Sequence, residues 1–137
     1  MNLEIIKTNK PLVKPDFLGK PLHFGVHHTD HMLEIDYFAN TWHDPLISKY
    51  HSFSMDPFNS SLHYGIQLFE GMKAFKTEEG KVTLFRPEMN MARMNQSAKR
   101  LSLPVRKNYD NFYNFIQIFL TFYKHFFLFY KVILFNF

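Results

Sequence analysis

The chain has 137 residues, which is enough for one modest domain with its own core and short for a two-domain enzyme. It contains no cysteine, so disulfide frameworks and thiolate metal sites are excluded and a reducing compartment is favoured. Its formal charge of +4 is unevenly placed, because residues 1–105 hold 12 Lys/Arg against 11 Asp/Glu and residues 106–137 hold four against one. The body therefore lacks the basic stripe that nucleic-acid binding needs.

The first residues give no sign of a targeting segment. Residues 1–20 carry Glu4 and Asp16 among four lysines, and they lack both an apolar stretch and an Arg/Ser-rich amphipathic pattern. We therefore expect neither a signal peptide nor a transit peptide, and residues 1–21 are interpreted as an extension before the first domain. The expected location is cytoplasmic, and a mitochondrial location is left open.

The first predicted element is a half-buried strand over residues 32–37. Leu33, Ile35 and Tyr37 alternate there with Glu34 and Asp36, which is the two-residue period of a strand. Residues 40–60 contain proline and aspartate and are expected to form a connection.

A β-hairpin followed by a helix is predicted next. Residues 71–75 form one strand, the polar segment 77–80 ends in glycine, and Val82 and Leu84 alternate with polar residues in the other strand. Pro87 and Glu88 suit the first turn of a helix, the proline through its fixed φ and the glutamate through its charge. One face of that helix is apolar (Met91, Met94, Ala98 and Leu101), and the other is polar (Arg93, Gln96 and Arg100). Strands followed by a helix indicate a small α/β domain.

The composition changes after Pro104. Thirteen of the 32 residues in 106–137 are Phe or Tyr, and the stretch has no Gly, Pro, Ala, Ser or Glu. Three interpretations stay open: translated A/T-rich non-coding sequence, an amphipathic helix within residues 111–122, and a membrane helix over residues 116–135 that Lys124 and Lys131 would make costly. We expect this stretch not to pack as part of the preceding domain, and we expect no membrane partner.

Three groups of residues could carry chemistry. Arg93 could clamp a phosphate with its planar fork of donors, although a solvated helix face explains the same pattern. His27 and His31 have helical metal-ligand spacing, but they lead straight into a predicted strand, so no metal site is expected. Glu70 could orient a neighbouring group beside Gly71, or the two could be a surface acid and a turn glycine.

Four segments together resemble the branched-chain amino acid aminotransferases. They are FGVHHTDHML from Phe24, LHYGIQLFEGMKAF from Leu62, KVTLFRPEMNMARM from Lys81 and SAKRLSLP from Ser97. The resemblance covers residues 22–105, in order and with compatible spacing. It departs from the family pattern at Gln67, Lys76 and Ala92.

The resemblance implies a fold-type IV pyridoxal 5′-phosphate (PLP) enzyme with a small N-terminal α/β domain, of which residues 22–105 are an incomplete copy, and a homodimeric assembly. The expected activity is amino-group transfer between leucine, isoleucine or valine and 2-oxoglutarate, so the partners are small amino acids and 2-oxo acids. Arg93 corresponds to a cofactor-binding residue that holds the PLP phosphate. Tyr64 and Phe24 correspond to substrate-binding residues of the side-chain pocket.

No catalytic residue is assigned, because no segment matches the family's Schiff-base lysine or the glutamate that pairs with the pyridinium nitrogen. Lys73 and Lys99 do not occupy the catalytic context. We therefore expect the second domain to be absent and this chain to be inactive alone. The alternatives are a non-catalytic dimerising or binding fragment and a mispredicted gene fragment. The alternatives that are enzymes are a D-amino acid aminotransferase and an aminodeoxychorismate lyase.

Overall fold

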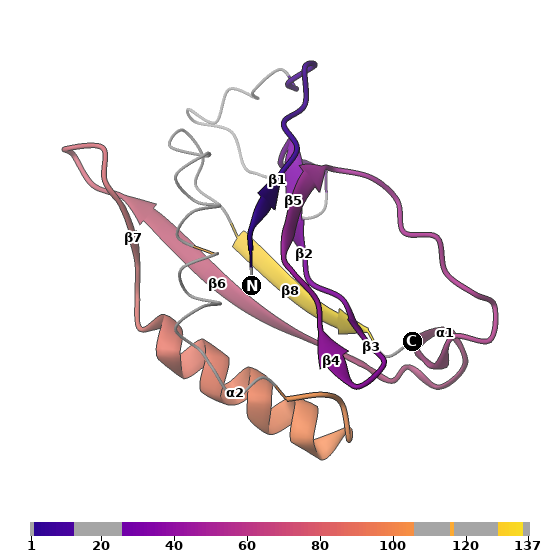
Figure 1. Ribbon diagram of the computed structural model, residues 1–137. Coiled ribbons are helices and arrows are strands. Elements are labelled where there is room, and N and C mark those ends of the chain that lie inside the picture. Colours follow the sequence, from indigo (N-terminus) through magenta and orange to yellow (C-terminus); the bar gives the residue numbers. More distant parts are fainter. Residues whose placement is uncertain (1, 13–25, 106–115, 117–128, 136–137) are drawn as a thin grey trace. The chain divides into compact units, whose positions relative to one another are not determined.

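The computed structural model describes residues 2–12, 26–105, 116 and 129–135, and the chain forms two compact units, Met1–Ser54 and Met55–Phe137 (Figure 1). We call them the N-terminal unit and the C-terminal unit, and each is described by itself. The domain boundaries expected at residues 21 and 105 stay predictions.

The N-terminal unit contains a three-stranded sheet in the order β1-β5-β2. The central strand β5 (Leu46–Lys49) runs parallel to β1 (Glu4–Ile5) and antiparallel to β2 (His31–Glu34). Ile47 in β5 and Pro45 just before it are fully buried side chains. The prediction of a plain connection over residues 40–60 is therefore wrong, because a strand of four residues carries too short an alternation to be recognised beside a proline.

The predicted strand over residues 32–37 is interrupted. It ends as β2 at Glu34, and the chain then forms a separate two-stranded ribbon from β3 (Tyr37–Phe38) and β4 (Thr41–Trp42). Ala39 and Asn40 between them both have positive φ, 49° and 58°, as a tight two-residue hairpin turn requires. Alanine is not a residue that signals such a turn, which explains why the hairpin was missed.

The C-terminal unit begins with a short helix, α1 (Ser60–Tyr64), that is capped at both ends. The Asn59 side chain accepts a hydrogen bond from the Ser61 amide at 2.8 Å, and Gly65 ends the helix in the left-handed conformation at φ 64°. Both capping residues, Asn59 and Gly65, lie within or next to the helix that contains the LHY residues, so short-range sequence specifies this helix.

The predicted hairpin is confirmed. The ten-residue strand β6 (Gln67–Lys76) pairs antiparallel with β7 (Val82–Leu84), from Ala74 opposite Leu84 to Lys76 opposite Val82. Gly80 supplies the positive φ of 81° in the turn. The first strand is longer than the residues 71–75 that the sequence predicted.

The predicted helix is also confirmed, as α2 (Pro87–Arg100), with proline in its first turn and Met91, Met94 and Ala98 buried. Leu101 was expected on the buried face but is 40% exposed, and Leu103 is buried in its place. The Leu103 and Ser102 amides donate to the Ala98 and Lys99 carbonyls at 2.9 and 3.2 Å, with Ser102 at φ 57°. This Schellman-type ending reverses the chain and turns Leu103 inward.

The core of the C-terminal unit lies between α2 and β6. Its buried members are Leu68, Met72, Ala74, Met91, Met94, Ala98, Leu103 and Ile116. The strand residues alternate and the helix residues recur every three or four positions, so each element buries one face. The fold is thus the small α/β arrangement that the sequence predicted.

The expectation that residues 106–137 stay out of the domain's packing is wrong for the described part of that stretch. β8 (Phe129–Phe135) pairs antiparallel with β6 from Gln67 opposite Phe135 to Lys73 opposite Phe129, giving the sheet order β7-β6-β8, and Ile116 is buried in the core. The open helical interpretation of residues 111–122 lies outside the described residues, apart from Ile116. Among the described residues, no helix combines the length and apolar character needed to cross a bilayer.

Candidate functional site

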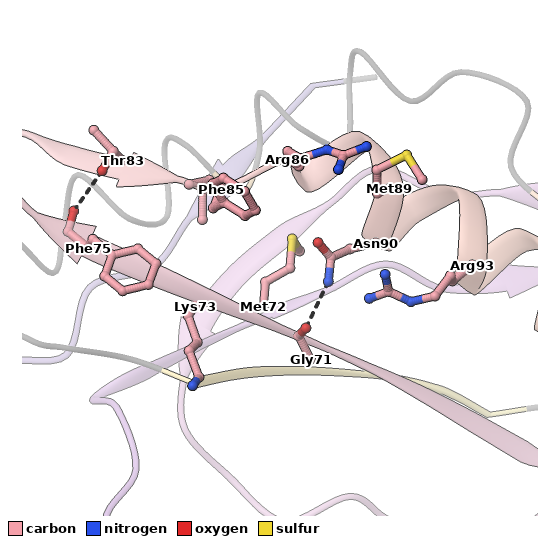
Figure 2. Close-up of a pocket in the computed structure, with 11 residues that line it drawn as sticks. Gly71, Met72, Lys73, Phe75, Thr83, Phe85, Arg86, Met89, Asn90 and Arg93 are labelled. Carbon is pink, nitrogen blue, oxygen red and sulfur yellow. Dashed lines mark hydrogen bonds between the residues drawn. The ribbon is translucent and has the colours of Figure 1, made fainter.

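An open groove of about 610 Å³ lies in the C-terminal unit where β6, the end of β7 and the first turns of α2 meet (Figure 2). Three elements that the sequence predicted, both strands of the hairpin and the helix, therefore converge on it. Its lining residues are Gly71, Met72, Lys73, Phe75, Thr83, Leu84, Phe85, Arg86, Met89, Asn90 and Arg93.

The charged residues in the described lining of this groove are all cations. They are Lys73 from β6, Arg86 at the start of α2 and Arg93 one to two turns into the helix, and no acidic residue is among the described lining residues. Arg86 has an exposed partner, because its Nε lies 3.9 Å from an Oε1 of Glu88. Three basic side chains around one groove favour an anionic ligand.

Arg93 is held by a carboxylate from the neighbouring strand. Its Nε donates to Oε2 of Glu70 at 3.2 Å and its Nη2 donates to Oε1 at 2.5 Å, so the two groups meet in the bidentate geometry of an arginine and a carboxylate. The Arg93 side chain is 57% exposed, whereas that of Glu70 is 12% exposed. The hydrogen bonds and charge of Glu70 raise the pKa of Arg93 further above its ordinary value, so the guanidinium stays charged.

Asn90 completes the arrangement from one helical turn before Arg93. Its Nδ2 donates to Oε1 of Glu70 at 2.8 Å and to the carbonyl of Gly71 at 2.9 Å (Figure 2 shows the second of these bonds). Burial by itself would raise the pKa of Glu70, but hydrogen bonds from Arg93 and Asn90, the Arg93 charge and the Gly71 backbone together lower it. Glu70 is therefore an ionised carboxylate near neutral pH.

The two interpretations of Glu70 and Gly71 are now distinguished. Gly71 lies inside β6, opposite Lys131, and is not a turn residue. Glu70 accepts hydrogen bonds from Arg93 and Asn90, which favours the alternative in which it orients a neighbouring group. Asn90 and Arg86 were missed by the sequence reasoning. Asn90 lies three residues before Arg93 on α2, and Arg86 is the residue that precedes this helix.

Of the two predicted substrate residues, the structure describes Tyr64 but not Phe24. Tyr64 ends α1 with 81% of the residue exposed, and it is not among the lining residues. Phe24 lies outside the described residues. The structure thus places Arg93 in the groove beside Glu70 and Asn90, while the phosphate role of Arg93 and the substrate roles of Tyr64 and Phe24 stay predictions.

The histidine cluster near residue 30 has other contacts. His31 lies in β2, where its Nε2 accepts a hydrogen bond from the Thr8 amide at 2.9 Å. His28 stacks on Tyr50 with ring centroids 3.8 Å apart and bonds the Thr29 carbonyl through Nδ1. Within the described ranges, no group of three or more His, Cys, Asp and Glu side chains is arranged to hold a metal ion.

Comparisons with known proteins find close relatives over most of the chain, although no family model matches it. The chain is 48% identical over 105 residues to branched-chain-amino-acid aminotransferase 2 of Bacillus subtilis, a match that covers 76% of this chain and 28% of the relative. It is 50% identical over 100 residues to the cytosolic enzyme of Saccharomyces cerevisiae, covering 72% of this chain and 26% of the relative. It is 46% identical over 104 residues to the mitochondrial enzyme of Bos taurus, covering 75% and 26%.

Identities of this size over about a hundred residues come from proteins of one family, and they agree with the four sequence segments that resemble it. The chain spans about a quarter of the length of these curated relatives. It belongs to the branched-chain-amino-acid aminotransferase family and corresponds to the N-terminal part of its members.

Proposed function

We propose that this chain contributes to amino-group transfer between leucine, isoleucine or valine and 2-oxoglutarate, in a fold-type IV PLP enzyme, by binding the cofactor phosphate at Arg93. When bound, PLP supplies the electron sink for the reaction. The relatives favour this reaction over those of the D-amino acid aminotransferases and aminodeoxychorismate lyases, since they carry the branched-chain name. The observation that carries the proposal is the cationic groove at β6 and α2, with Arg93 held in it by Glu70.

The donor set of the groove fits a phosphate. A guanidinium has five N–H donors, and among the described residues Glu70 takes two of those on Arg93, so up to three can serve a ligand. More than half of the Arg93 side chain is exposed to the groove and solvent. Charge-assisted bonds from arginine to phosphate are stronger than neutral ones, and the fork geometry adds specificity.

Tyr64 and Phe24 are proposed to contact the branched side chain, whose recognition rests on burial of methylene and methyl groups. The Tyr64 ring is open to solvent in this chain, so other groups must cover it to form such a pocket. Homodimer formation is also proposed. For location, the relatives include proteins named cytosolic and mitochondrial, and we propose a cytoplasmic site.

The phosphate anchor can be tested on the chain itself with pyridoxine 5′-phosphate, which lacks the aldehyde and cannot react with lysines. Arg93→Ala should weaken its binding about ten- to a hundredfold, the effect of losing a charged hydrogen bond. Arg93→Lys should recover only part, because lysine keeps the charge and loses the planar fork. Isothermal titration or NMR titration measures both.

Arg100→Ala is the matched control, since Arg100 lies on the same helix and does not line the groove. Pyridoxine without the phosphate controls for binding of the ring alone. Equal affinity of the chain and Arg93→Ala for the phosphate ester would refute the anchor.

The reaction can be tested in a chimera in which residues 26–105 replace the matched segment of the Bacillus subtilis relative. We expect leucine-dependent turnover of 2-oxoglutarate that Arg93→Ala strongly reduces. The 137-residue polypeptide tested as it stands should give no turnover above a no-enzyme control, because none of its segments matches the family's Schiff-base lysine context. Turnover by the polypeptide alone, or an inactive chimera that is folded, would contradict this account.

A further inference from the structure

Glu70 occupies a position where a carboxylate is costly. It lies on β6 between Leu68 and Met72, and residues two apart on a strand share a face, so it lies on the face that α2 covers. Its side chain is 12% exposed. A charge withdrawn from water to this extent destabilises the fold unless it is paired and hydrogen-bonded.

The hydrogen bonds around Glu70 use both of its oxygens and fix the plane of the Arg93 guanidinium. Oε1 accepts from Nη2 of Arg93 and from Nδ2 of Asn90, while Oε2 accepts from Nε of Arg93. Two parallel bonds define the orientation of a planar fork, which a single bond would leave free to rotate. Asn90 is fixed in turn, because its Nδ2 also donates to the Gly71 carbonyl within β6.

An arginine side chain has several rotatable bonds, and fixing them on ligand binding costs free energy. Arg93 on its own would have to be ordered by the ligand, since more than half of its side chain is exposed. Its two bonds to Glu70, whose carboxylate Asn90 also holds, order it beforehand. In Figure 2 the Arg93 guanidinium lies next to Asn90 at the edge of the groove.

From this we infer that Glu70 and Asn90 are positioning residues, which hold the Arg93 guanidinium in the orientation that receives a phosphate in the groove. The inference rests on the proposed function, because it takes the phosphate anchor as given. It adds that the affinity for the anion depends on a carboxylate that carries the same sign of charge as the ligand.

The direction in which Glu70→Gln changes the affinity for the anion therefore tests the inference. If Glu70 acted only through its charge, Glu70→Gln would remove a repulsion and tighten binding of an anion. If Glu70 positions Arg93, the same change weakens binding, because glutamine has one acceptor oxygen and an NH2 group that cannot accept the second guanidinium bond. The matched control is Glu88→Gln, which removes an exposed carboxylate beside Arg86 at the start of the same helix.

The experiment uses the full 137-residue chain, with pyridoxine 5′-phosphate and inorganic phosphate as probes, and follows the Arg93 Nε–H signal by NMR. We expect Glu70→Gln and Asn90→Ala to weaken binding of both probes roughly two- to tenfold, the effect of losing an ordinary hydrogen bond. In Glu70→Gln the Arg93 Nε–H should also exchange with water faster. Glu88→Gln should leave the Arg93 signal unchanged and should not weaken binding.

The outcomes separate this inference from the proposed function. Tighter or unchanged binding in Glu70→Gln, or an Arg93 Nε–H signal that the substitution does not alter, overturns the positioning role while the anchor stands. Failure of the unsubstituted chain to bind either probe overturns the anchor and the positioning role with it. Glu70→Asp separates position from charge: it keeps the charge and shortens the reach, so it too should weaken binding.

Discussion

The N-terminal unit is built from strands of two to four residues, whereas the C-terminal unit is organised around the ten-residue strand β6 and the fourteen-residue helix α2. The first buries Ile47 and Pro45 fully, and the second buries a cluster of eight residues contributed mainly by β6 and α2. The groove and the Arg93 ion pair lie in the second. A long strand against a helix can hold a charged pair in one geometry, because the core on both sides fixes the backbone that carries it.

The largest effect should follow truncation of a large buried residue of the larger core. Met72→Ala removes a buried side chain between β6 and α2 and should lower the free energy of unfolding by about 2–5 kcal/mol. Urea unfolding followed by circular dichroism measures this. Met89→Ala on the exposed side of α2 is the control, expected within about 0.5 kcal/mol of the original chain. If Met72→Ala and Met89→Ala lower the free energy of unfolding equally, the core does not lie between β6 and α2.

A smaller effect is expected in the N-terminal unit. Ile47→Val removes one methyl group from the buried position of β5 and should cost about 0.5–1.5 kcal/mol. Ile6→Val at an exposed position should change little, and the same urea unfolding experiment compares the two. If Ile47→Val leaves the free energy of unfolding unchanged, the short-stranded sheet has no packed centre, and the two units differ more in core packing than the buried Ile47 indicates.

The ion pair of the C-terminal unit should make its stability depend on acid pH. The pKa of Glu70 is lower in the folded chain than its usual value, so its stabilising contribution is present above the unfolded pKa, about 4.3, and is lost as pH falls through the folded pKa. The difference in unfolding free energy between the chain and Glu70→Gln should therefore narrow as the pH falls below about 4.3. A difference that stays constant from pH 7 to acid would contradict the ionised pair.

The smallest effect should come from the exposed pair of the N-terminal unit. A hydrogen bond to the Ser52 carbonyl, followed by the hydrogen bond and charge of Glu34, raises the pKa of His51. Its stabilising contribution is present below the unfolded pKa, about 6.5, and is lost as pH rises through the folded pKa. In an NMR titration, Glu34→Gln should lower the pKa of His51 only in part, because the Ser52 contact stays. Glu88→Gln, in the other unit, should leave it unchanged.

The local elements around the site could be predicted from the sequence alone. Pro87 and Glu88 mark the start of α2, the alternation around Val82 together with Gly80 marks the hairpin, and Met91, Met94 and Ala98 mark the buried face. Each of these signals lies within a few residues of the structure it specifies, because turn geometry and helix periodicity are properties of short segments. The resemblance to the family likewise lay in contiguous segments of the sequence, so it could be recognised without the structure.

Only the tertiary structure decided which distant groups meet. Glu70 and Arg93 are 23 residues apart, and their bidentate contact depends on how α2 lies on β6. Three other features also depend on packing partners that a local sequence pattern does not specify. They are the pairing of β8 with β6, the central place of β5 and the inward turn of Leu103. Strand pairing and ion pairing are chosen by the burial and hydrogen bonds of the whole unit, so a sequence read segment by segment cannot supply them.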